Sequence, residues 1–473
     1  MNQLISRQFA RARLRTLGAG VLVVLCMLVI ARLAPRASSR EVLLLAGLLG
    51  VLWLAGRPQW GLILLIAVSL VVPISLGTGT LTQIPLSLLL LVALMGLWVT
   101  DMARRREWAL ADTPANAPLF ALIIMAGLSI VVGDALWNPF VQTKGNFTFV
   151  QLAQWGVFIL SAGAYWLTAN TLHDVRWLKR LVIVFLSVGV AYIGLRLLDW
   201  WAILTPVFAR GSVGSLLWVW LVALAGGQAL FNRRLETPLR AGLALLILVT
   251  LSLAWFQARA WVSGWAPALA ALLLLFLLKK PVMGTLVTAG LALVVRFLYP
   301  GVWGAVVTDA IEGGSFARLD AWRGIVQLVG NRWPVGLGLA AYWHYWRDLV
   351  GTWAYSATNV VANPTVNSHN NYVDIFAQMG VLGLGIFLWL AVALWRQGWT
   401  IRHAVPDGFE RGYVYGCLAG LVGSLASGMF ADWFLPFVYN IGLEGMRVSL
   451  LGWVFLGGQV TLATLTRNAG TAH

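Results

Sequence analysis

The chain has 473 residues, of which 60% are hydrophobic and only 11% are charged. Ordinary soluble globular proteins carry about 25% charged residues. The low charged fraction, together with a mean hydropathy of +0.82, therefore excludes a protein of that class. The formal net charge of +16 would suit a nucleic-acid partner, but the basic residues occupy separate short loops and form no groove. The composition therefore predicts an all-α polytopic membrane protein that binds no nucleic acid.

Apolar stretches long enough to cross a bilayer recur along almost the whole sequence, separated by short breaks with arginine, proline or glycine. The predicted spans are 17–34, 41–56, 59–75, 84–100, 116–132, 148–169, 179–199, 213–231, 240–256, 260–278, 282–299, 381–397, 412–431 and 447–466. They make about 14 helices. The number falls to about 12 if short neighbours within 40–75 or 240–299 are re-entrant or form one bent helix.

The N-terminus resembles a signal peptide, because arginines at Arg7 to Arg15 precede an apolar run. No small-residue cleavage site follows, so we interpret the run as the first, retained helix. The two cysteines, Cys26 and Cys417, both fall inside predicted spans. Their positions argue against a disulfide, a metal site or thiol catalysis.

Basic residues cluster at every second loop, which places those loops in the cytoplasm by the positive-inside rule. The clusters are Arg7 to Arg15, Arg57, Arg104 to Arg106, Arg176 to Arg180, Arg233 to Arg240, Lys279 with Lys280, and Arg396 to Arg411. Both termini are then cytoplasmic under either helix count. The alternate loops face outward, and among them is the one long segment that is not hydrophobic.

That segment defines three expected parts: N-terminal helices (1–299), an outward helical domain (300–380) ahead of the last three spans, and C-terminal helices (381–473). Long loops in compact membrane proteins are usually functional, so a site is expected in the middle part. Its tryptophans and tyrosines suit an aromatic belt at the headgroup level, and they would also stack on sugar rings. Short amphipathic helices are expected there, broken at Asn331 and Pro334.

His369 is the histidine best placed for chemistry, since it faces outward in "NSHNNY", where Ser368 could cap a new helix. Helical spacing puts Tyr372, Gly380 and Gly383 on its face, and the two glycines would let a neighbouring helix approach closely. A single histidine here fits a structural role as well as a catalytic one. The other histidines are His173 and His403 in cytoplasmic loops, the terminal His473, and His344 in the aromatic segment "AYWHYW".

Arginines on the predicted outer side are a second signal, since arginine is scarce there. They include Arg210 in "TPVFARGSVG", Arg259 in "FQARAWVSG", and Arg318 and Arg323 in "FARLDAWRG". Guanidinium groups bind phosphate oxygens with paired hydrogen bonds. Near a membrane those phosphates belong either to ordinary lipids or to a lipid-linked substrate, and snorkelling toward headgroups is the alternative for any single arginine.

Several kinds of site are missing from the sequence. It contains no Walker loop, no His-Glu-x-x-His and no Gly-x-Ser-x-Gly. The acidic residues on the outer side are scattered among loops, at Asp134, Asp199, Asp309, Glu312, Asp320, Asp348, Asp374, Asp432 and Glu444. We therefore expect no metal site, and arginines rather than a divalent cation would stabilise a diphosphate leaving group.

One motif has a recognisable spacing. His369-Asn370, nine residues and Gly380-x-x-Gly383 fit the pattern His-[Asn/Ser/Gln]-x9-Gly-x-x-Gly. Further motifs precede it in order: an arginine at the outward start of a mid-chain helix, then "ARLDAW", then "PVGLG". In these motifs, over about residues 205 to 400, the chain resembles the O-antigen ligases of the bacterial surface-polysaccharide ligase and polymerase superfamily. Elsewhere the likeness is one of hydropathy alone.

The resemblance implies a glycosyltransferase of the polytopic C class (GT-C) in the inner membrane of a Gram-negative bacterium. Such an enzyme transfers O-antigen from undecaprenyl diphosphate to lipid A core at the periplasmic face, without cofactor, metal or ATP. By this resemblance His369 acts on the acceptor hydroxyl, as a base or only to orient it, and Arg259 and Arg318 hold the diphosphate, with Arg210 as a third candidate. Possible supporting residues are Asn370, Tyr372, Arg323, Gly380 and Gly383. The sequence Gln257-Ala258-Arg259 departs from the family's Ser-Arg form, which leaves any hydroxyl role there open.

Three alternatives remain. An O-antigen polymerase shares the helices and the lipid-linked donor but typically lacks the His-Asn-x9-Gly-x-x-Gly element. A protein O-oligosaccharyltransferase generally adds a soluble domain after the last span, whereas this sequence ends about seven residues after it. A transporter of lipid-linked glycans would have ionisable residues in mid-span and an inverted repeat, and no convincing repeat is visible.

Overall fold

The computed structural model describes residues 50, 53–54, 56–79, 82–200, 208, 214–257, 262–298, 318–351 and 368–470. Contacts between backbone positions divide the chain into two units, Met1–Pro58 and Gln59–His473. Few residues of the first unit are described, and the features below lie in the second. The described residues are almost all helical, with one short pair of strands.

The described residues contain nine helices that are long and apolar enough to cross a membrane. They are α4 (Leu86–Arg105), α5 (Asn116–Ala135), α6 (Phe147–Thr171), α7 (Val175–Leu197), α10 (Thr237–Gln257), α11 (Val262–Lys279), α17 (Asn371–Ile401), α18 (Phe409–Phe430) and α19 (Met446–Gly470). Shorter apolar helices are α3 (Pro58–Val71), α9 (Ser215–Phe231) and α12 (Pro281–Leu298). The chain is therefore a multi-pass membrane protein, as its composition predicts.

Each predicted span from 59–75 onward overlaps one of these helices. The spans predicted at 17–34 and 41–56 fall on residues that, apart from 50, 53–54 and 56, lie outside the described part of the chain. One boundary differs clearly from its prediction. The span predicted at 381–397 belongs to α17, which already begins at Asn371, because the polar residues at its start are capped and buried rather than left in a loop.

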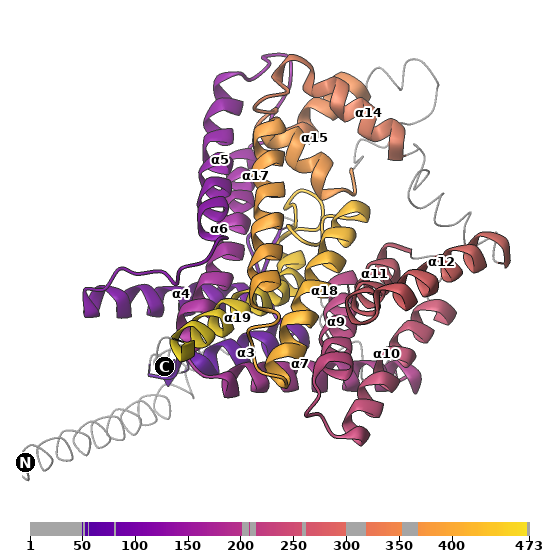
Figure 1. The fold of residues 1–473 in the computed structure, drawn as a ribbon. Coiled ribbons are helices and arrows are strands. Elements are labelled where there is room, and N and C mark those ends of the chain that lie inside the picture. The colour runs from indigo at the N-terminus through magenta and orange to yellow at the C-terminus, as the bar shows by residue number, and fades with distance from the viewer. Residues whose placement is uncertain are drawn as a thin grey trace, which may run out of the picture. The chain divides into compact units, whose positions relative to one another are not determined.

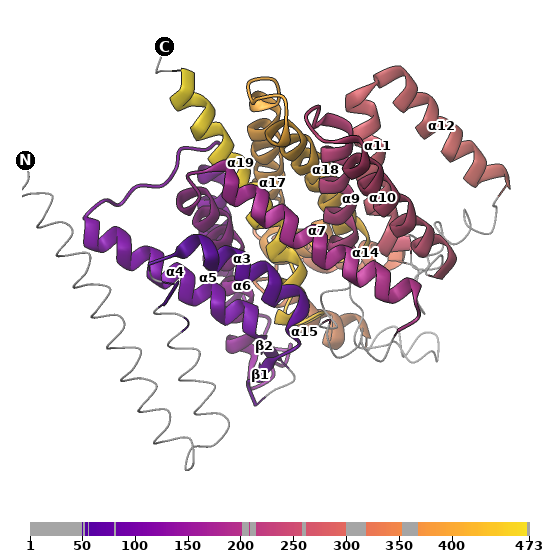
Figure 2. The same ribbon diagram turned by 90° about the horizontal axis from the view of Figure 1, so that it is seen from below.

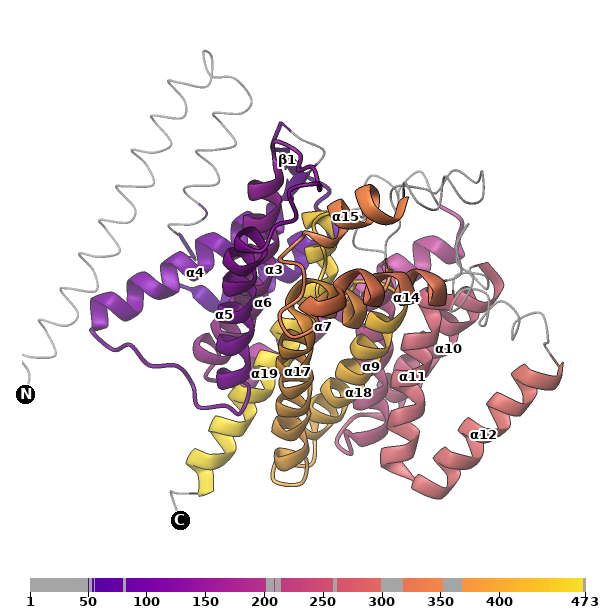
Figure 3. The same cartoon turned by 90° about the horizontal axis from the view of Figure 1, so that it is seen from above.

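The aromatic segment also contains short helices, as expected. They are α14 (Arg318–Val329), α15 (Tyr342–Tyr345), the 3₁₀ turn η2 (Gly330–Arg332) and the π-helical turn η3 (Trp346–Gly351). Figure 1 shows α14 and α15 at the end of α17 where that helix begins, and Figure 3 shows α14 crossing over this end. The segment is thus folded onto the start of α17.

Helix α9 lies at the centre of the packing, between α18, α11, α10, α19 and α7 (Figure 2). It carries no charged residue and is buried on nearly every side. Glycines make its closest contacts, since Gly227 lies against the backbone of Gly416, and Gly420 lies against the ring of Trp220. Small residues let helix backbones approach closely inside membranes, where burying apolar surface gives little drive for association.

Basic loops gather at one end of the helices. Lys279 donates to the carbonyl oxygen of Leu230 at 2.6 Å, and Arg233 and Arg411 both pair with Asp407. These residues come from three of the loops that charge alone assigns to one side of the membrane. The beginning of α17 lies at the opposite end, because α17 runs from Asn371 to Ile401 at the basic end.

A two-stranded antiparallel hairpin, β1 (Ser75–Gly77) with β2 (Gln83–Pro85), interrupts an otherwise helical chain that the sequence predicted to be all-α. A fully buried arginine, Arg447, holds it. The guanidinium donates to Glu444 and to the carbonyl oxygens of Val72 (2.6 Å) and Ile74 (3.0 Å). A buried charge is tolerated when it is paired and its donors are satisfied, so Arg447 has a structural role.

Helix α17 is broken at Gly380, whose φ of 65° and ψ of −165° are not helical. In an unbroken helix the N–H groups after the break would donate to carbonyl oxygens four residues earlier. The loop 333–338, which contains "PVGLG", supplies the missing partners. Its carbonyl oxygens accept from the N–H groups after the break, and its own N–H groups donate to the carbonyl oxygens before the break. Four backbone hydrogen bonds join the two, from Leu337 N to Ala377 O (2.8 Å), from Gly338 N to Gln378 O (3.1 Å), from Val381 N to Trp333 O (2.8 Å) and from Leu382 N to Pro334 O (3.2 Å).

We call this arrangement the backbone crossover. It corrects the expectation that Gly380 and Gly383 open one helical face to a neighbouring helix. A Cβ at Gly380 would lie 2.3 Å from the carbonyl carbon of Pro334, so a loop and not a helix makes the close approach, whereas the nearest atoms to Gly383 belong to Met379 of the same helix. Gly338 in turn lies against Gly133 of α5. The crossover therefore fixes the aromatic segment to α17 and to α5.

Replacing Gly380 with alanine is expected to destabilise the protein severely. The left-handed φ alone costs about 1–3 kcal/mol, and the Cβ would also overlap the Pro334 backbone, giving a loss of about 3 kcal/mol or more. Gly385→Ala is the matched control, since it lies in the same helix with nothing within 4 Å of its added Cβ. Thermal unfolding in detergent measures both. Equal unfolding temperatures for the two variants would contradict the crossover.

Candidate functional site

The segment Ser368–Asn370 leads into α17. The Asn370 side chain accepts hydrogen bonds from the backbone N–H groups of Tyr372 (2.9 Å) and Val373 (3.2 Å), and so caps the helix. The cap is therefore Asn370 and not Ser368, which corrects the prediction. The hydroxyl of Ser368 instead accepts from Asn370 N at 3.0 Å and donates to its carbonyl oxygen at 3.1 Å.

His369 lies directly before the cap and is half-buried. Its φ of 47° is in the left-handed region, which a residue other than glycine seldom occupies and which is frequent at functional sites. Because it precedes Asn370, it is outside the helix and shares no helical face with the glycines. The imidazole is thus held on a turn of fixed geometry, with both of its flanking residues buried.

Two side chains fix this turn to α18. The Asn370 amide donates to the carbonyl oxygen of Met429 at 3.2 Å. The Tyr372 hydroxyl donates to the carbonyl oxygen of Leu425 at 3.0 Å. Asn371 adds a third contact, since its amide donates to Leu435 O at 2.7 Å in the loop that follows α18. Asn370 and Tyr372, both predicted as supporting residues, therefore position the turn that carries His369.

Helix α14 reaches the same turn. The indole N–H of Trp322 donates to the carbonyl oxygen of Ser368 at 2.8 Å. Arg318 is the first residue of α14, one helical turn before Trp322, and Arg323 follows Trp322 with an exposed side chain. The contact brings the "ARLDAW" motif beside His369.

The other two predicted arginines, Arg210 and Arg259, lie outside the described residues. Described residues close to them in the sequence are the ends of α10 and α11 and Gly214. Arg259 belongs to the connection between the last residue of α10 and the first of α11. Gly214, which follows Arg210 after a short interval and caps α9, lies against the ring of Trp433 in the loop after α18. That loop also contacts the start of α17 through Asn371.

Two carboxyl groups meet below the His369 turn. Asp374 in the first turns of α17 and Asp432 in the loop after α18 are buried, with 0% and 1% of their surface exposed, and they interact electrostatically. The prediction that the outer acidic residues are scattered is wrong for this pair. No span signal pointed to either residue, because Asp374 precedes the predicted span 381–397 and Asp432 follows the predicted span 412–431.

The surroundings of the pair are polar but uncharged. The hydroxyl groups of Tyr342, Tyr439 and Ser368 lie around Asp374, yet neither of its carboxyl oxygens has a hydrogen-bond partner of good geometry. Asp432 accepts from the N–H of Phe437 at 3.2 Å and from the Asn440 amide. Burial raises the pKa of Asp432 to about 7. Burial, together with the carboxyl of Asp374, also raises the pKa of Tyr342 and Tyr439 well above the usual range.

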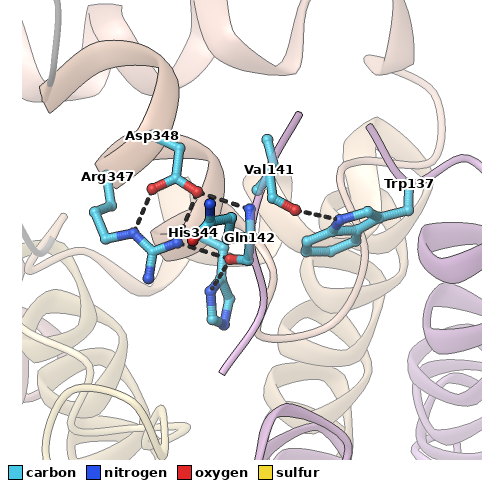
Figure 4. A network of polar contacts seen from close by, with 6 residues as sticks. All are labelled: Trp137, Val141, Gln142, His344, Arg347 and Asp348. Carbon is cyan, nitrogen blue, oxygen red and sulfur yellow. Dashed lines mark hydrogen bonds and ion pairs between the residues drawn. The ribbon is translucent and has the colours of Figure 1, made fainter. Parts of the chain in front are cut away.

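The second histidine of the aromatic segment, His344, has a different role (Figure 4). Its Nδ1 lies 3.2 Å from the carbonyl oxygen of Gln142, which also accepts from Arg347. Asp348 pairs with Arg347 and accepts from the Gln142 N–H. Burial, and then the nearby Arg347, lower the pKa of His344 to about 4. The neutral imidazole holds the connection between α5 and α6 to α15, and the Arg347–Asp348 pair holds the same connection to η3, so this network is structural.

Among the described residues, no three His, Cys, Asp or Glu side chains come together as a group that could hold a metal ion. A pocket of about 360 Å³ lies at the basic end. It is lined by the residues just before α5, by the end of α17 and by the last turns of α19, and its lining includes Thr113, Gln397 and Arg467. It is at the opposite end of α17 from His369.

No protein-family model matches the sequence, and no curated protein matches it.

Replacing Asn370 with alanine should destabilise α17 and displace the His369 turn. The lost cap costs about 0.5–2 kcal/mol, and the bond to Met429 O is lost as well. Asn370→Asp keeps a capping oxygen and should recover most of the loss. Asn146→Ala is the control, because Asn146 precedes α6 without a side-chain capping bond. Unfolding temperatures in detergent decide the matter, and equal effects of N370A and N146A would refute the capping role.

Proposed function

We propose that this protein is an O-antigen ligase: a glycosyltransferase that moves O-antigen from undecaprenyl diphosphate to lipid A core. The observation that carries the proposal is that two motifs of the aromatic segment each contact the third motif, which begins at His369 ahead of α17. Trp322 of "ARLDAW" donates to Ser368 O, next to His369, and "PVGLG" completes the broken helix at Gly380. Motifs that recur together in one family are expected to form one functional unit, and here they do touch.

The proposed site faces the periplasm of a Gram-negative inner membrane. This orientation rests on the basic residues, since the loops with Lys279, Arg233 and Arg411 gather at the end opposite His369 and basic loops favour the cytoplasm. Both substrates carry lipid anchors and reach such a site within the membrane. A GT-C enzyme of this kind needs no ATP, because the diphosphate ester of the donor is already activated.

His369 is the proposed base. As the acceptor hydroxyl oxygen bonds to the anomeric carbon, the bond from that carbon to the diphosphate breaks and the hydroxyl proton moves to the imidazole. A histidine with an ordinary pKa of about 6.5 accepts such a proton, and general-base catalysis contributes about 10²- to 10⁴-fold. A single displacement inverts the configuration of the transferred sugar. The fixed turn before the Asn370 cap supplies the orientation.

The arginines are the proposed ligands of the diphosphate. Arg318 starts α14, whose Trp322 contacts the His369 turn. Arg259 is assigned to the same task by its motif, and Arg210 is the third candidate because of its place on the predicted outer side. Guanidinium groups bind phosphate oxygens in pairs and stabilise the negative charge that develops as the diphosphate departs. Arg323, exposed on α14, is a further candidate for contacting headgroups or substrate.

His369→Ala and Arg318→Ala should each abolish ligation, because one removes the base and the other a diphosphate ligand. The assay is long-chain lipopolysaccharide on silver-stained gels of a ligase-null host, with membrane levels of each variant measured by immunoblot. His403→Ala, an exposed histidine at the basic end, should complement fully. The base assignment is wrong if the His369→Ala protein restores long-chain lipopolysaccharide.

Complementation of three deletion strains separates the related functions. A strain without a ligase accumulates finished polymer on undecaprenyl diphosphate. A strain without a polymerase transfers single repeat units to core, and one without a flippase keeps the lipid-linked unit inside. Complementation of only the ligase-null strain is the result that supports the proposal.

Ligation by the purified protein should proceed at an unchanged rate in EDTA. The reason is that arginines, rather than a bound divalent cation, are proposed to neutralise the departing diphosphate. The measurement is transfer of lipid-linked polymer to purified core with and without chelator. A rate that collapses in EDTA and returns with magnesium would overturn the arginine assignment.

A further inference from the structure

The carboxyl pair, Asp374 and Asp432, has no place in the ligation chemistry proposed above. The two groups come from separate elements and meet only because α17 and the loop after α18 pack together. Both are buried, and they interact electrostatically. Two ionised carboxylates cannot share a buried site without strong repulsion, so such pairs retain a proton.

Among the described residues that act on Asp374, none brings a positive charge that would stabilise two carboxylates. Neither oxygen of Asp374 has a hydrogen-bond partner of good geometry. Within the described part of the chain, the titratable groups that act on it most strongly are Asp432 from the loop after α18, Tyr342 from α15 and Tyr439 from the same loop as Asp432. None of these three carries a positive charge.

The pair also occupies a junction. Ser368 N donates to the Tyr342 hydroxyl at 3.3 Å, and the rings of Tyr342 and Tyr439 meet edge to face with centroids 5.3 Å apart. The Gln378 amide donates to Tyr439 Oη at 3.3 Å and to the carbonyl oxygen of Asp374 at 3.1 Å. The His369 turn, α15 and the loop after α18 are therefore all held around these two carboxyl groups.

We propose that Asp374 and Asp432 hold one proton between them, and that this proton keeps the His369 turn packed against the loop after α18. Loss of the proton places two charges in a buried site. Their repulsion separates Asp374, and the turn that precedes it, from Asp432. Asp374 is thus a positioning residue that acts on His369 through the chain and touches no substrate.

The consequence for stability follows from linkage. Burial raises the pKa of Asp432 to about 7 in the folded protein, whereas unfolded carboxyl groups ionise near pH 4. Between these values the folded state binds more protons than the unfolded state. The contribution of this pair to the free energy of unfolding is therefore largest below about pH 4, and this contribution falls as the pH rises toward 7.

The first experiment is infrared spectroscopy of the full-length protein in detergent at pH 5.5, above the range in which ordinary carboxyl groups ionise and below the raised pKa of Asp432, which is about 7. We expect the carbonyl band of a neutral carboxylic acid in the wild type, and its loss in the Asp374→Asn, Asp432→Asn double variant. Asp101→Asn is the matched control, since Asp101 is an exposed partner of Arg105, and it should keep the band. A wild-type spectrum without the band would overturn the proposal, and this reading requires no variant to fold.

The second experiment compares unfolding temperatures of the wild type and Asp374→Asn from pH 5 to 8. An amide imitates a neutral carboxylic acid in size and in its donor group, so Asp374→Asn should fold and should lose most of the decline with rising pH that the wild type shows. An unchanged pH profile in a folded Asp374→Asn protein would also overturn the proposal.

The effect on transfer rests on the proposed function. Wild-type ligation should fall at alkaline pH as the turn moves, with kcat affected more than KM for the donor, and Asp374→Asn should extend activity to higher pH. A folded Asp374→Asn protein that is inactive at every pH would show that an ionised Asp374 is required, which contradicts a shared proton. Absence of transfer in the wild type would count against the ligase function alone, since the infrared and unfolding results remain decisive for the pair.

Discussion

The backbone crossover at Gly380 is the constraint on which the rest of this structure depends. A helix in a membrane must satisfy every backbone group, and α17 breaks without violating this rule because the loop 333–338 supplies the missing donors and acceptors. The break redirects the first turns of α17, and with them His369. The same four bonds anchor the aromatic segment, so α14 and α15 acquire a fixed position over the end of the helix.

Uncharged amides make several of the polar contacts that join the start of α17 to α18 and to the loop after α18. Asn370 caps α17 and holds α18, Asn371 holds the loop after α18, and Gln378 joins α17 to Tyr439 and to the backbone of Ala340. Gln154 of α6 clamps the same loop through Pro436 O and Val438 N. Amides can donate and accept without the cost of burying a charge. The carboxyl pair is the exception, and a shared proton would make it follow the same principle.

The two ends of α17 differ in a way that fits a transferase acting on lipid-borne substrates. One end gathers paired basic residues such as Arg411 with Asp407, and the other presents a histidine on a constrained turn beside a helix that begins with an arginine. His344 lies close by in the chain fold but is buried and neutral. Burial thus distinguishes His344, which is part of the scaffold, from the half-buried His369, which is the proposed base.

The sequence by itself determined the helices and the side on which charge collects, because apolar length and the distribution of arginine and lysine are local properties of the chain. It also singled out His369 and its Asn370 neighbour by spacing. Only the tertiary structure decided which residue caps α17, that Gly380 receives a loop rather than a helix, and that Asp374 meets Asp432. These features arise between segments that are remote in sequence, and no local pattern encodes the hydrogen bonds and burial that bring such segments together.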